Sequence, residues 1–512
     1  MADDNPTATS PELPEEGTLE ASPPSPPVPE TDQETPLSPP LILTNKESTV
    51  SPPSPPVPPP EEESQETPLS LPLILTSKET AFSPPPSSTT IGELIEHPER
   101  QRPIPINKIP ESMVSFKEES NKVKDLSDLE KVSLTEFKQL LQEAITGKDS
   151  NFSSNSEEPS SETKSNHEEI SIWGIPLLKD ERSDVILLKF LRARDFKVKD
   201  SFLMLKNTFL WRKAFSIDDL VDENLGDGLE KVVFMHGYDK EGHPVCYNVY
   251  GEFQDKELYQ KTFSDEEKRT RFLKWRIQFL ERSIRKLDFR PGGINTIFQV
   301  SDLKNSPGPG KRELRLATKQ ALQLLQDNYP EFVAKQVFIN VPWWYLAFYS
   351  MMSPFMTQRT KSKFVFASPA RTAETLFKYV GPEHVPIQYG GLSVDYCDCN
   401  PEFTVDDPAA AVTVKPTTKQ TVEIIVHEKC TIVWELRVVG WEVSYSAEYV
   451  PKNEGNYTIN IQKPKKLAAT DEPVISHRFK VNELGTLLLT IDNPTSKKKM
   501  LLYRFKVDPF VE

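Results

Sequence analysis

The chain of 512 residues is long enough for two or three domains, and its 61 basic and 76 acidic side chains give a formal net charge of −15. Residues 1–100 contain eighteen acidic and three basic side chains, so the acidity belongs to this segment and residues 101–512 are close to neutral. A nucleic-acid-binding domain normally has a strongly basic face, and this charge distribution excludes one.

The first segment, residues 1–169, is rich in Pro, Ser, Thr and Glu and contains a repeat. Residues 33–47 read QETPLSPPLILTNKE, and residues 65–79 read QETPLSLPLILTSKE. Such a composition buries too little apolar surface to offset its ordering entropy, so we expect disorder with one exception. Several Ser-Pro and Thr-Pro pairs suit proline-directed kinases, which predicts a phosphoprotein; a solvating spacer is the alternative.

Asp3 and Asp4 replace the basic and apolar start of a secretory signal, so we expect a cytoplasmic protein.

The exception is an amphipathic helix predicted over residues 133–147. Ser133 and Glu136 have the spacing of a capping box, and Gly147 is typical of a helix end. The apolar face comprises Leu134, Phe137, Leu140, Leu141, Ala144 and Ile145. We expect this face to dock on the folded body of the protein; a partner protein or a membrane are the alternatives.

Order is predicted from residue 170 onward, first as helices over residues 170–225 and then as an α/β unit over residues 226–400. The helices are expected at 184–196 and 200–215, the second with Leu203, Phe209 and Leu210 on its buried face. Strand patterns occur at 231–236, 244–250, 295–302, 336–341 and 364–367, and helix patterns at 265–287, 311–328 and 373–379. This alternation predicts a sheet covered by helices.

The most unusual stretch has no charged side chain between Lys335 and Arg359. A strand pattern leads to Pro342, a short helix apolar on every side follows, and basic residues come after it. A helix without a polar face must be buried, face lipid, or alternate between the two. We expect a lid over a lipid pocket, and an ordinary core helix is the alternative. The expected lid and acyl-pocket residues are Trp343, Trp344, Phe348, Met351, Met352 and Phe355.

Residues 401–512 change to a period of two, which is typical of half-buried strands. Seven strands are expected, at 420–426, 431–438, 441–449, 456–462, 474–481, 486–492 and 500–507. About seven short strands in ~100 residues predict a β-sandwich. Lys497, Lys498 and Lys499 lie on the last hairpin, where they would attract an anionic membrane surface; a solubilising turn is the alternative.

Residues that carry out catalysis are missing from the sequence. It contains no GxSxG, HExxH or GxxxxGK[ST] motif, and its seven histidines are scattered. The four cysteines fit neither a disulfide framework nor a zinc site. We therefore expect a protein that is not an enzyme and binds no metal.

Four motifs resemble those of the CRAL-TRIO lipid-binding fold with its N-terminal helical extension. They are FLRAR at 190–194, DNYPE at 327–331, FINVP at 338–342 and QYGG at 388–391. The sandwich after residue 400 resembles a GOLD domain. An acidic Pro-rich segment, a CRAL-TRIO domain and a GOLD domain in this order resemble the plant patellins. The best-known CRAL-TRIO proteins are phosphatidylinositol transfer proteins.

The resemblance implies a headgroup site, transferred here position by position. Arg194, Glu331, Thr360 and Lys363 match the residues that contact inositol phosphate in the family. Their chemistry fits, because Arg and Lys donate charge-assisted hydrogen bonds to phosphate and Glu accepts from ring hydroxyls. The chain departs from the fungal transfer protein at Asp195, where that protein has a basic residue. A structural ion pair is the alternative for Glu331 and Lys363.

The resemblance implies a non-enzymatic carrier or sensor for phosphoinositides or other hydrophobic lipids, acting in membrane trafficking and, as in patellins, in cell-plate formation. It implies no cofactor apart from the bound lipid, and a peripheral protein on an anionic membrane. Protein partners are expected through the GOLD domain and the Pro-rich segment. The alternative is an adaptor that recruits proteins through these regions and uses lipid only for regulation.

Overall fold

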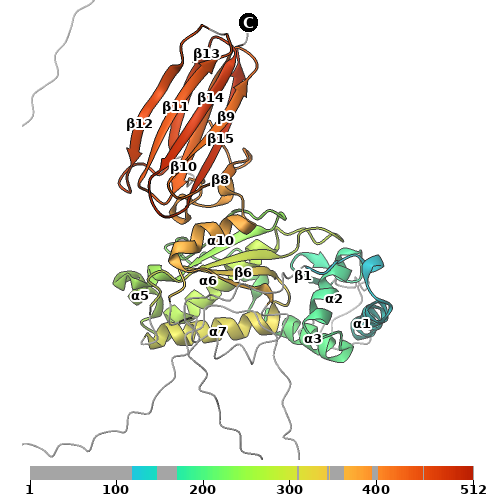
Figure 1. Cartoon of the computed structure of the whole chain (residues 1–512). Helices are drawn as coiled ribbons and strands as arrows, with labels where there is room; N and C mark the ends of the chain where they lie inside the picture. The colour runs from blue at the N-terminus through green and yellow to red at the C-terminus, as the bar shows by residue number, and fades with distance from the viewer. Residues whose placement is uncertain are drawn as a thin grey trace, which may run out of the picture. The chain divides into compact units, whose positions relative to one another are not determined.

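The computed structural model describes residues 118–146, 170–307, 311–342, 345, 362–394, 402–453 and 455–510 (Figure 1). These residues contain sheets of two, four, four and five strands. The five-stranded sheet belongs to an α/β unit, and the two four-stranded sheets lie after residue 402 and contain no helix. The predicted fold class, an α/β domain with N-terminal helices followed by an all-β sandwich, is confirmed.

The N-terminal part is helical and begins earlier than predicted. Its elements are η1 (Val123–Asp125), α1 (Asp128–Thr146), β1 (Ser171–Ile172), β2 (Ile175–Pro176), α2 (Arg182–Arg192), α3 (Val198–Ala214) and α4 (Ile217–Leu220). The capping box forms at Ser127 and Glu130, six residues before the predicted one. The backbone N–H of Ser127 donates to Glu130 Oε2 at 2.8 Å. The apolar face of α1 is buried with α2 and α3, so the helix docks on the body of the protein.

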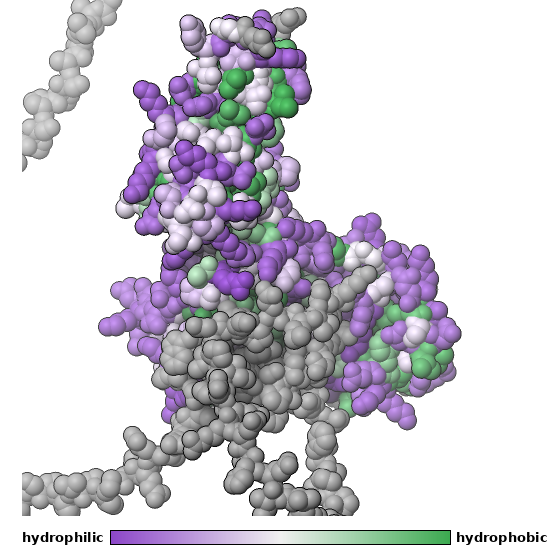
Figure 2. Space-filling view, viewed as in Figure 1, coloured by the Kyte–Doolittle hydropathy of each residue, from purple (hydrophilic) through white to green (hydrophobic). Residues whose placement is uncertain are grey.

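The buried face of α3 differs from the prediction. Leu203 is 56% exposed and Leu210 is 40% exposed, whereas Ser201, Thr208 and Arg212 are buried. The apolar pattern predicted the wrong face because these polar side chains have hydrogen-bond partners inside the protein. The hydroxyls of Ser201 and Thr208 donate to backbone carbonyls one turn earlier, and the Arg212 guanidinium donates to Glu281. Figure 2 shows hydrophobic residues gathered at the surface of the helices at the N-terminal end.

The α/β unit is built on a sheet with the strand order β3-β4-β5-β6-β7. The strands are β3 (Val233–Tyr238), β4 (Pro244–Val249), β5 (Ile297–Asp302), β6 (Val333–Ile339) and β7 (Phe364–Phe366). β3 is antiparallel to β4, and the other neighbours are parallel. The surrounding helices are η2 (Tyr250–Gln254), α5 (Lys256–Phe263), α6 (Glu266–Ile284), α7 (Arg312–Asn328), η4 (Pro369–Arg371), α10 (Thr372–Tyr379), η5 (Pro382–His384) and η6 (Ile387–Tyr389).

Helices cover both faces of this sheet, as parallel strands require. Figure 1 shows α6 and α7 on one face and α10 on the other. Cys246 and Ile297 pack with Trp275 of α6 on the first face, and Val300 and Val337 pack with α10 on the second. Alternate residues of each strand therefore enter two different cores.

Two backbone conformations are unusual in the α/β unit, and the first lies at the edge of the sheet described below. Glu331, between α7 and β6, has φ 53°, a left-handed conformation that is uncommon for a residue with a side chain. In the QYGG motif Gly390 has φ 98°, and a Cβ on Gly391 would lie 1.9 Å from the carbonyl oxygen of Val385. The second glycine is thus required by close backbone approach.

The C-terminal sandwich has two sheets, with strand orders β13-β10-β15-β8 and β12-β11-β14-β9. The strands are β8 (Ala410–Val414), β9 (Thr418–Val426), β10 (Cys430–Val439), β11 (Val443–Pro451), β12 (Ile459–Leu467), β13 (Ile475–Val481), β14 (Gly485–Asn493) and β15 (Lys499–Pro509). All seven predicted strands are present. β8 was not predicted because its first residues are exposed and it pairs only at a sheet edge.

Candidate functional site

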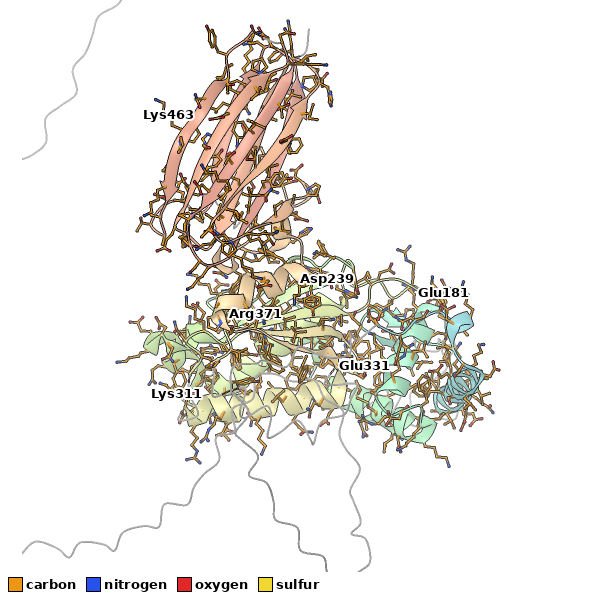
Figure 3. The ribbon with its side chains drawn as sticks, viewed as in Figure 1. Glu181, Asp239, Lys311, Glu331, Arg371 and Lys463 are labelled. Carbon is orange, nitrogen blue, oxygen red and sulfur yellow. The ribbon has the colours of Figure 1, made fainter. Side chains whose placement is uncertain are left out.

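A polar cavity lies between the N-terminal helices and the edge of the sheet at which β6 and β7 begin. It is lined by Glu118, Glu119, Asn121, Lys189, Arg192, Asn295, Glu331 and Lys363. Figure 3 shows Glu331 at this edge of the sheet, facing the N-terminal helices. Three cationic and three anionic side chains share the cavity, which makes it a candidate site for a charged ligand.

Two of the predicted headgroup residues meet here. Lys363 Nζ lies 2.8 Å from Glu331 Oε2, and both side chains are mostly buried, with 13% and 17% of their surface exposed. Glu331 is held by its left-handed backbone after α7, and Lys363 directly precedes β7. The pair has the chemistry of a headgroup site, and a structural ion pair would have the same geometry. Thr360 lies outside the described residues.

Arg194 is placed differently from the prediction. Its guanidinium donates to the carbonyl oxygen of Ala193 at 2.9 Å, and the side chain does not line the cavity with Glu331 and Lys363. The FLRAR motif instead directs Arg192 into the cavity. α2 ends at Arg192, so Arg194 and Asp195 belong to the turn that follows the helix.

Lys189 is a site residue that our sequence analysis missed. It is 2% exposed, and its Nζ donates to the carbonyl oxygens of Asn295 at 2.9 Å and Glu331 at 2.8 Å. Burial lowers the pKa of the Lys189 ammonium to about 7. Lys189 and Arg192 are three residues apart and so share one face of α2. Two cations on one face of an otherwise apolar helix was the signal in the sequence.

Arg192 binds a segment that precedes α1. Its Nη1 donates to Asn121 Oδ1 at 2.5 Å, its Nη2 donates to the carbonyl oxygen of Ser120 at 2.6 Å, and its Nε lies 2.9 Å from Glu119 Oε2. The guanidinium is 9% exposed, so these contacts are shielded from water. Arg192 is therefore fully engaged by residues 119–121.

A buried histidine binds the same segment. His243 is 3% exposed, its Nδ1 lies 2.9 Å from Asp239 Oδ2, and its Nε2 lies 3.0 Å from Glu118 Oε2. Burial alone would lower the pKa of His243, but hydrogen bonds to both carboxylates raise it to about 9. Burial alone would raise the pKa of Glu118, but the hydrogen bond from His243 and the charge of that imidazolium bring it below its ordinary value. His243 is thus a cation between two carboxylates at neutral pH.

The stability of the protein should depend on pH through His243. Its pKa is about 9 in the folded protein against 6.5 ordinarily, so its contribution is complete below pH 6.5 and is lost as the pH rises through 9. We expect the stability advantage of the wild type over His243→Gln to shrink between pH 6 and pH 9.5 in urea unfolding. The exposed His427→Gln is the control and should show no such change. A constant difference for His243→Gln would contradict the assignment.

The predicted lid residues Trp343, Trp344, Phe348, Met351, Met352 and Phe355 lie outside the described residues. Tyr345, which is described, has its ring centroid 6.0 Å from that of Phe338 and 6.3 Å from that of Phe366.

Among the residues that the structure describes, no helix is long and apolar enough to cross a membrane. The same residues contain no cluster of His, Cys, Asp or Glu that would hold a metal ion.

The three lysines predicted to contact a membrane do not form one exposed group. Lys497 is exposed, and Lys498 Nζ forms an ion pair with Glu374 Oε1 at 2.9 Å. Lys499 is 9% exposed, and its Nζ donates to the carbonyl oxygen of Trp441 at 2.8 Å. The prediction is wrong for Lys499, because β15 starts at this residue and directs its side chain inward.

Three family models match the chain. The CRAL/TRIO domain matches residues 230–391, the CRAL/TRIO N-terminal domain matches 133–207, and the Patellin-1-like C-terminal GOLD domain matches 415–499. Together with the fold, these matches define the class: lipid-binding proteins in which a CRAL/TRIO domain precedes a GOLD domain.

The curated relatives identify the family within this class. Patellin-3 of Arabidopsis thaliana is 68% identical over 401 residues, which cover 78% of this chain and 79% of that protein. Patellin-5 of the same plant is also 68% identical over 401 residues, covering 78% of this chain and 57% of that protein. The chain belongs to the patellin family.

More distant relatives match the α/β part. The phosphatidylinositol transfer protein SFH5 of Meyerozyma guilliermondii is 31% identical over 234 residues, covering 43% of this chain and 67% of that protein. Among solved structures, a crystal structure of Sfh5 aligns with 22% identity and a TM-score of 0.39, covering 49% of this chain and 83% of that one.

Proposed function

We propose that this protein is a non-enzymatic carrier or sensor that binds a phosphoinositide and transfers or presents it between membranes. The observation that carries the proposal is the cavity in which Lys189, Arg192 and Lys363 lie close to Glu331. The cations suit phosphate oxygens, and the carboxylate suits the hydroxyls of an inositol ring. The name of the phosphatidylinositol transfer protein among the relatives supports the same ligand class.

The physical chemistry of lipids dictates how such a carrier works. Two acyl chains of roughly sixteen carbons contain about thirty methylenes, and hiding each from water is worth ~0.8 kcal/mol, or ~24 kcal/mol together. A lipid held in this way does not leave through water at a useful rate. Exchange therefore takes place with the protein on a bilayer, which makes it a peripheral protein of the cytoplasmic face of a membrane. The uncharged stretch before Arg359 is the proposed lid.

Membership of the patellin family supports a proposal for the cellular role. Membrane trafficking, and cell-plate formation in dividing cells, are the processes that we propose for this carrier. The GOLD domain and the Pro-rich N-terminal segment are the proposed contacts with proteins at that membrane. An adaptor that uses lipid only for regulation is the competing function, and it differs in one measurable respect: it does not move lipid.

Purification of the full chain followed by lipid extraction and mass spectrometry tests the proposal. We expect an inositol lipid to be recovered with the protein. We also expect the protein to accelerate movement of fluorescent phosphatidylinositol between donor and acceptor vesicles. Copurification of lipid without transfer between vesicles would favour the adaptor. If no lipid copurifies and no transfer is detected, both the carrier and the sensor are contradicted.

A further inference from the structure

The segment that covers the cationic side chains of the cavity comes from the chain itself. Glu118, Glu119 and Asn121 line the cavity, and together with Ser120 they contact Arg192 and His243. We call residues 118–121 the acidic strap. They are about seventy residues from Arg192 in sequence, so the contact is tertiary and not a local turn.

The strap presents oxygen atoms to the cations in the way that an anionic ligand would. Arg192 donates from Nη1 to an amide oxygen and from Nη2 to a carbonyl oxygen of the strap, and the Glu119 carboxylate pairs with its charge. Phosphate engages a guanidinium through the same set of parallel N–H donors. The Glu118 carboxylate accepts from His243 in addition. Every contact of the strap named here is of a kind that a phosphate oxygen could replace.

The charges identify the ligand class. The strap brings two carboxylates, Glu118 and Glu119, to a cavity that also contains Lys189, Arg192 and Lys363. A phosphate monoester carries about −1.5 to −2 charges at pH 7 and so replaces both carboxylates, whereas a phosphodiester with a single charge replaces one. Withdrawal of the strap alone would remove two of the three carboxylates that share the cavity with Lys189, Arg192 and Lys363, which is unfavourable. The cavity therefore holds either the strap or a comparable anion.

We propose that the acidic strap occupies a binding site for a phosphate monoester, and that an inositol ring phosphate displaces residues 118–121 from Lys189, Arg192 and Lys363. This inference rests on the proposed function and adds to it the competitor of the phosphate, residues 118–121. The monoester belongs either to a ring-phosphorylated inositol lipid or to a soluble inositol phosphate, which share this chemistry.

The strap is held by polar contacts and not by apolar packing. The side chains of Glu118 and Glu119 are 33% and 45% exposed. The next element, η1, contains no buried residue, so the first apolar anchor after the strap is Leu126. Release of residues 118–125 consequently exposes little apolar surface, and its cost is the loss of the polar contacts with Arg192 and His243, which an anion in the cavity would replace.

The test uses the full chain with Glu118→Gln and Glu119→Gln combined, because this change keeps the shape of the strap and removes its charge. The control is Glu136→Gln with Glu143→Gln, the same change of charge on the exposed face of α1. The probes are inositol 1,4,5-trisphosphate in calorimetry and vesicles with phosphatidylinositol 4-phosphate or unphosphorylated phosphatidylinositol in flotation.

We expect the strap variant to bind the phosphorylated probes about tenfold more tightly than wild type and the control, because two charge-assisted competitors are gone. Binding to unphosphorylated phosphatidylinositol should change less. Tighter binding of both phosphorylated probes identifies the phosphate itself as the ligand, and tighter binding of vesicles alone identifies the lipid. Equal affinity of wild type and strap variant for both phosphorylated probes would overturn the inference while leaving lipid binding, and the proposed function, intact.

Hydrogen exchange on the wild-type chain provides a second measurement that does not depend on a variant. Saturation with the phosphorylated probe should increase amide exchange in residues 118–126 and leave α1 unchanged. Bound probe with unchanged exchange in this segment would also overturn the inference. If neither the wild type nor the variants bind any of the vesicles, the proposed function itself is contradicted. That result differs from equal affinity of wild type and strap variant, and from bound probe with unchanged exchange.

Discussion

Replacing Arg212 with methionine is expected to lower the free energy of unfolding by about 3–5 kcal/mol, the usual cost of removing one partner of a buried ion pair. Arg212 Nη1 lies 2.5 Å from Glu281 Oε1, and the Glu281 side chain is 0% exposed. The same oxygen accepts a hydrogen bond of 2.7 Å from the Tyr329 hydroxyl. Burial alone would lower the pKa of Arg212, but Glu281 raises it above its ordinary value, so the pair is ionised.

Urea unfolding followed by tryptophan fluorescence measures this effect. The control is Arg290→Met, which removes an exposed arginine from its pair with Asp288 and should cost less than about 1 kcal/mol. The double variant Arg212→Met, Glu281→Leu should recover much of the loss, because an apolar pair of similar size often replaces a buried ion pair without penalty. A loss under about 1 kcal/mol for Arg212→Met alone would contradict the buried pair.

The effect should extend to ligand binding. Tyr329 precedes Pro330 and Glu331, and Glu281 fixes the Tyr329 hydroxyl. The ion pair therefore supports the turn that places the Glu331 carbonyl against Lys189 and the Glu331 carboxylate against Lys363. Arg212 acts on the cavity only through this turn and does not contact it.

Replacing Lys363 with alanine is expected to weaken binding to vesicles containing a phosphoinositide by about 10- to 100-fold, since a hydrogen bond to a charged group contributes ~1.5–3 kcal/mol. Flotation at fixed ionic strength measures the change. Lys286→Ala, which removes one exposed charge elsewhere, controls for net charge and should bind like the wild type. Lys363→Ala also removes the ion pair with Glu331, so thermal unfolding of both variants is measured and binding is compared at a temperature at which both are folded.

Arg194→Ala belongs in the same experiment, because the resemblance to the family assigns Arg194 to the headgroup. In the structure Arg194 donates to the carbonyl oxygen of Ala193, and Arg192 lines the cavity. We expect the Arg194 variant to lose less affinity than the Lys363 variant. Full binding by the Lys363 variant would remove that lysine from the site.

The strand pattern of the C-terminal domain could be predicted well because several strands have one buried face and one face that is partly exposed to solvent. β14 alternates buried and half-buried residues along its whole length, and Leu487, Leu489 and Ile491 form its dry side. The N-terminal helices were harder. α3 buries Ser201, Thr208 and Arg212 and exposes Leu203, so periodicity of apolar residues assigned the wrong face.

The candidate site was predicted in part. The family motifs contained Glu331 and Lys363, and the structure brings these two together. Lys189 and the strap were missed for a physical reason. The spacing of Lys189 and Arg192 indicates one shared helix face, but the partners that stabilise the buried Lys189, the carbonyls of Asn295 and Glu331, are distant in sequence and follow from no local pattern. Residues 118–121 have an ordinary polar composition, which gives no indication of a tertiary role.

Lys189 has a consequence for how occupancy of the cavity is coupled to the solvent. With a pKa lowered to about 7, the Lys189 amine can gain or lose its proton near neutral pH. A ligand that is more negative than residues 118–121 favours the ammonium form of Lys189, and a ligand that is less negative favours the neutral amine. Replacement of residues 118–121 by a ligand therefore moves protons between the cavity and the buffer. The heat of ligand binding measured by calorimetry consequently depends on the ionisation enthalpy of that buffer.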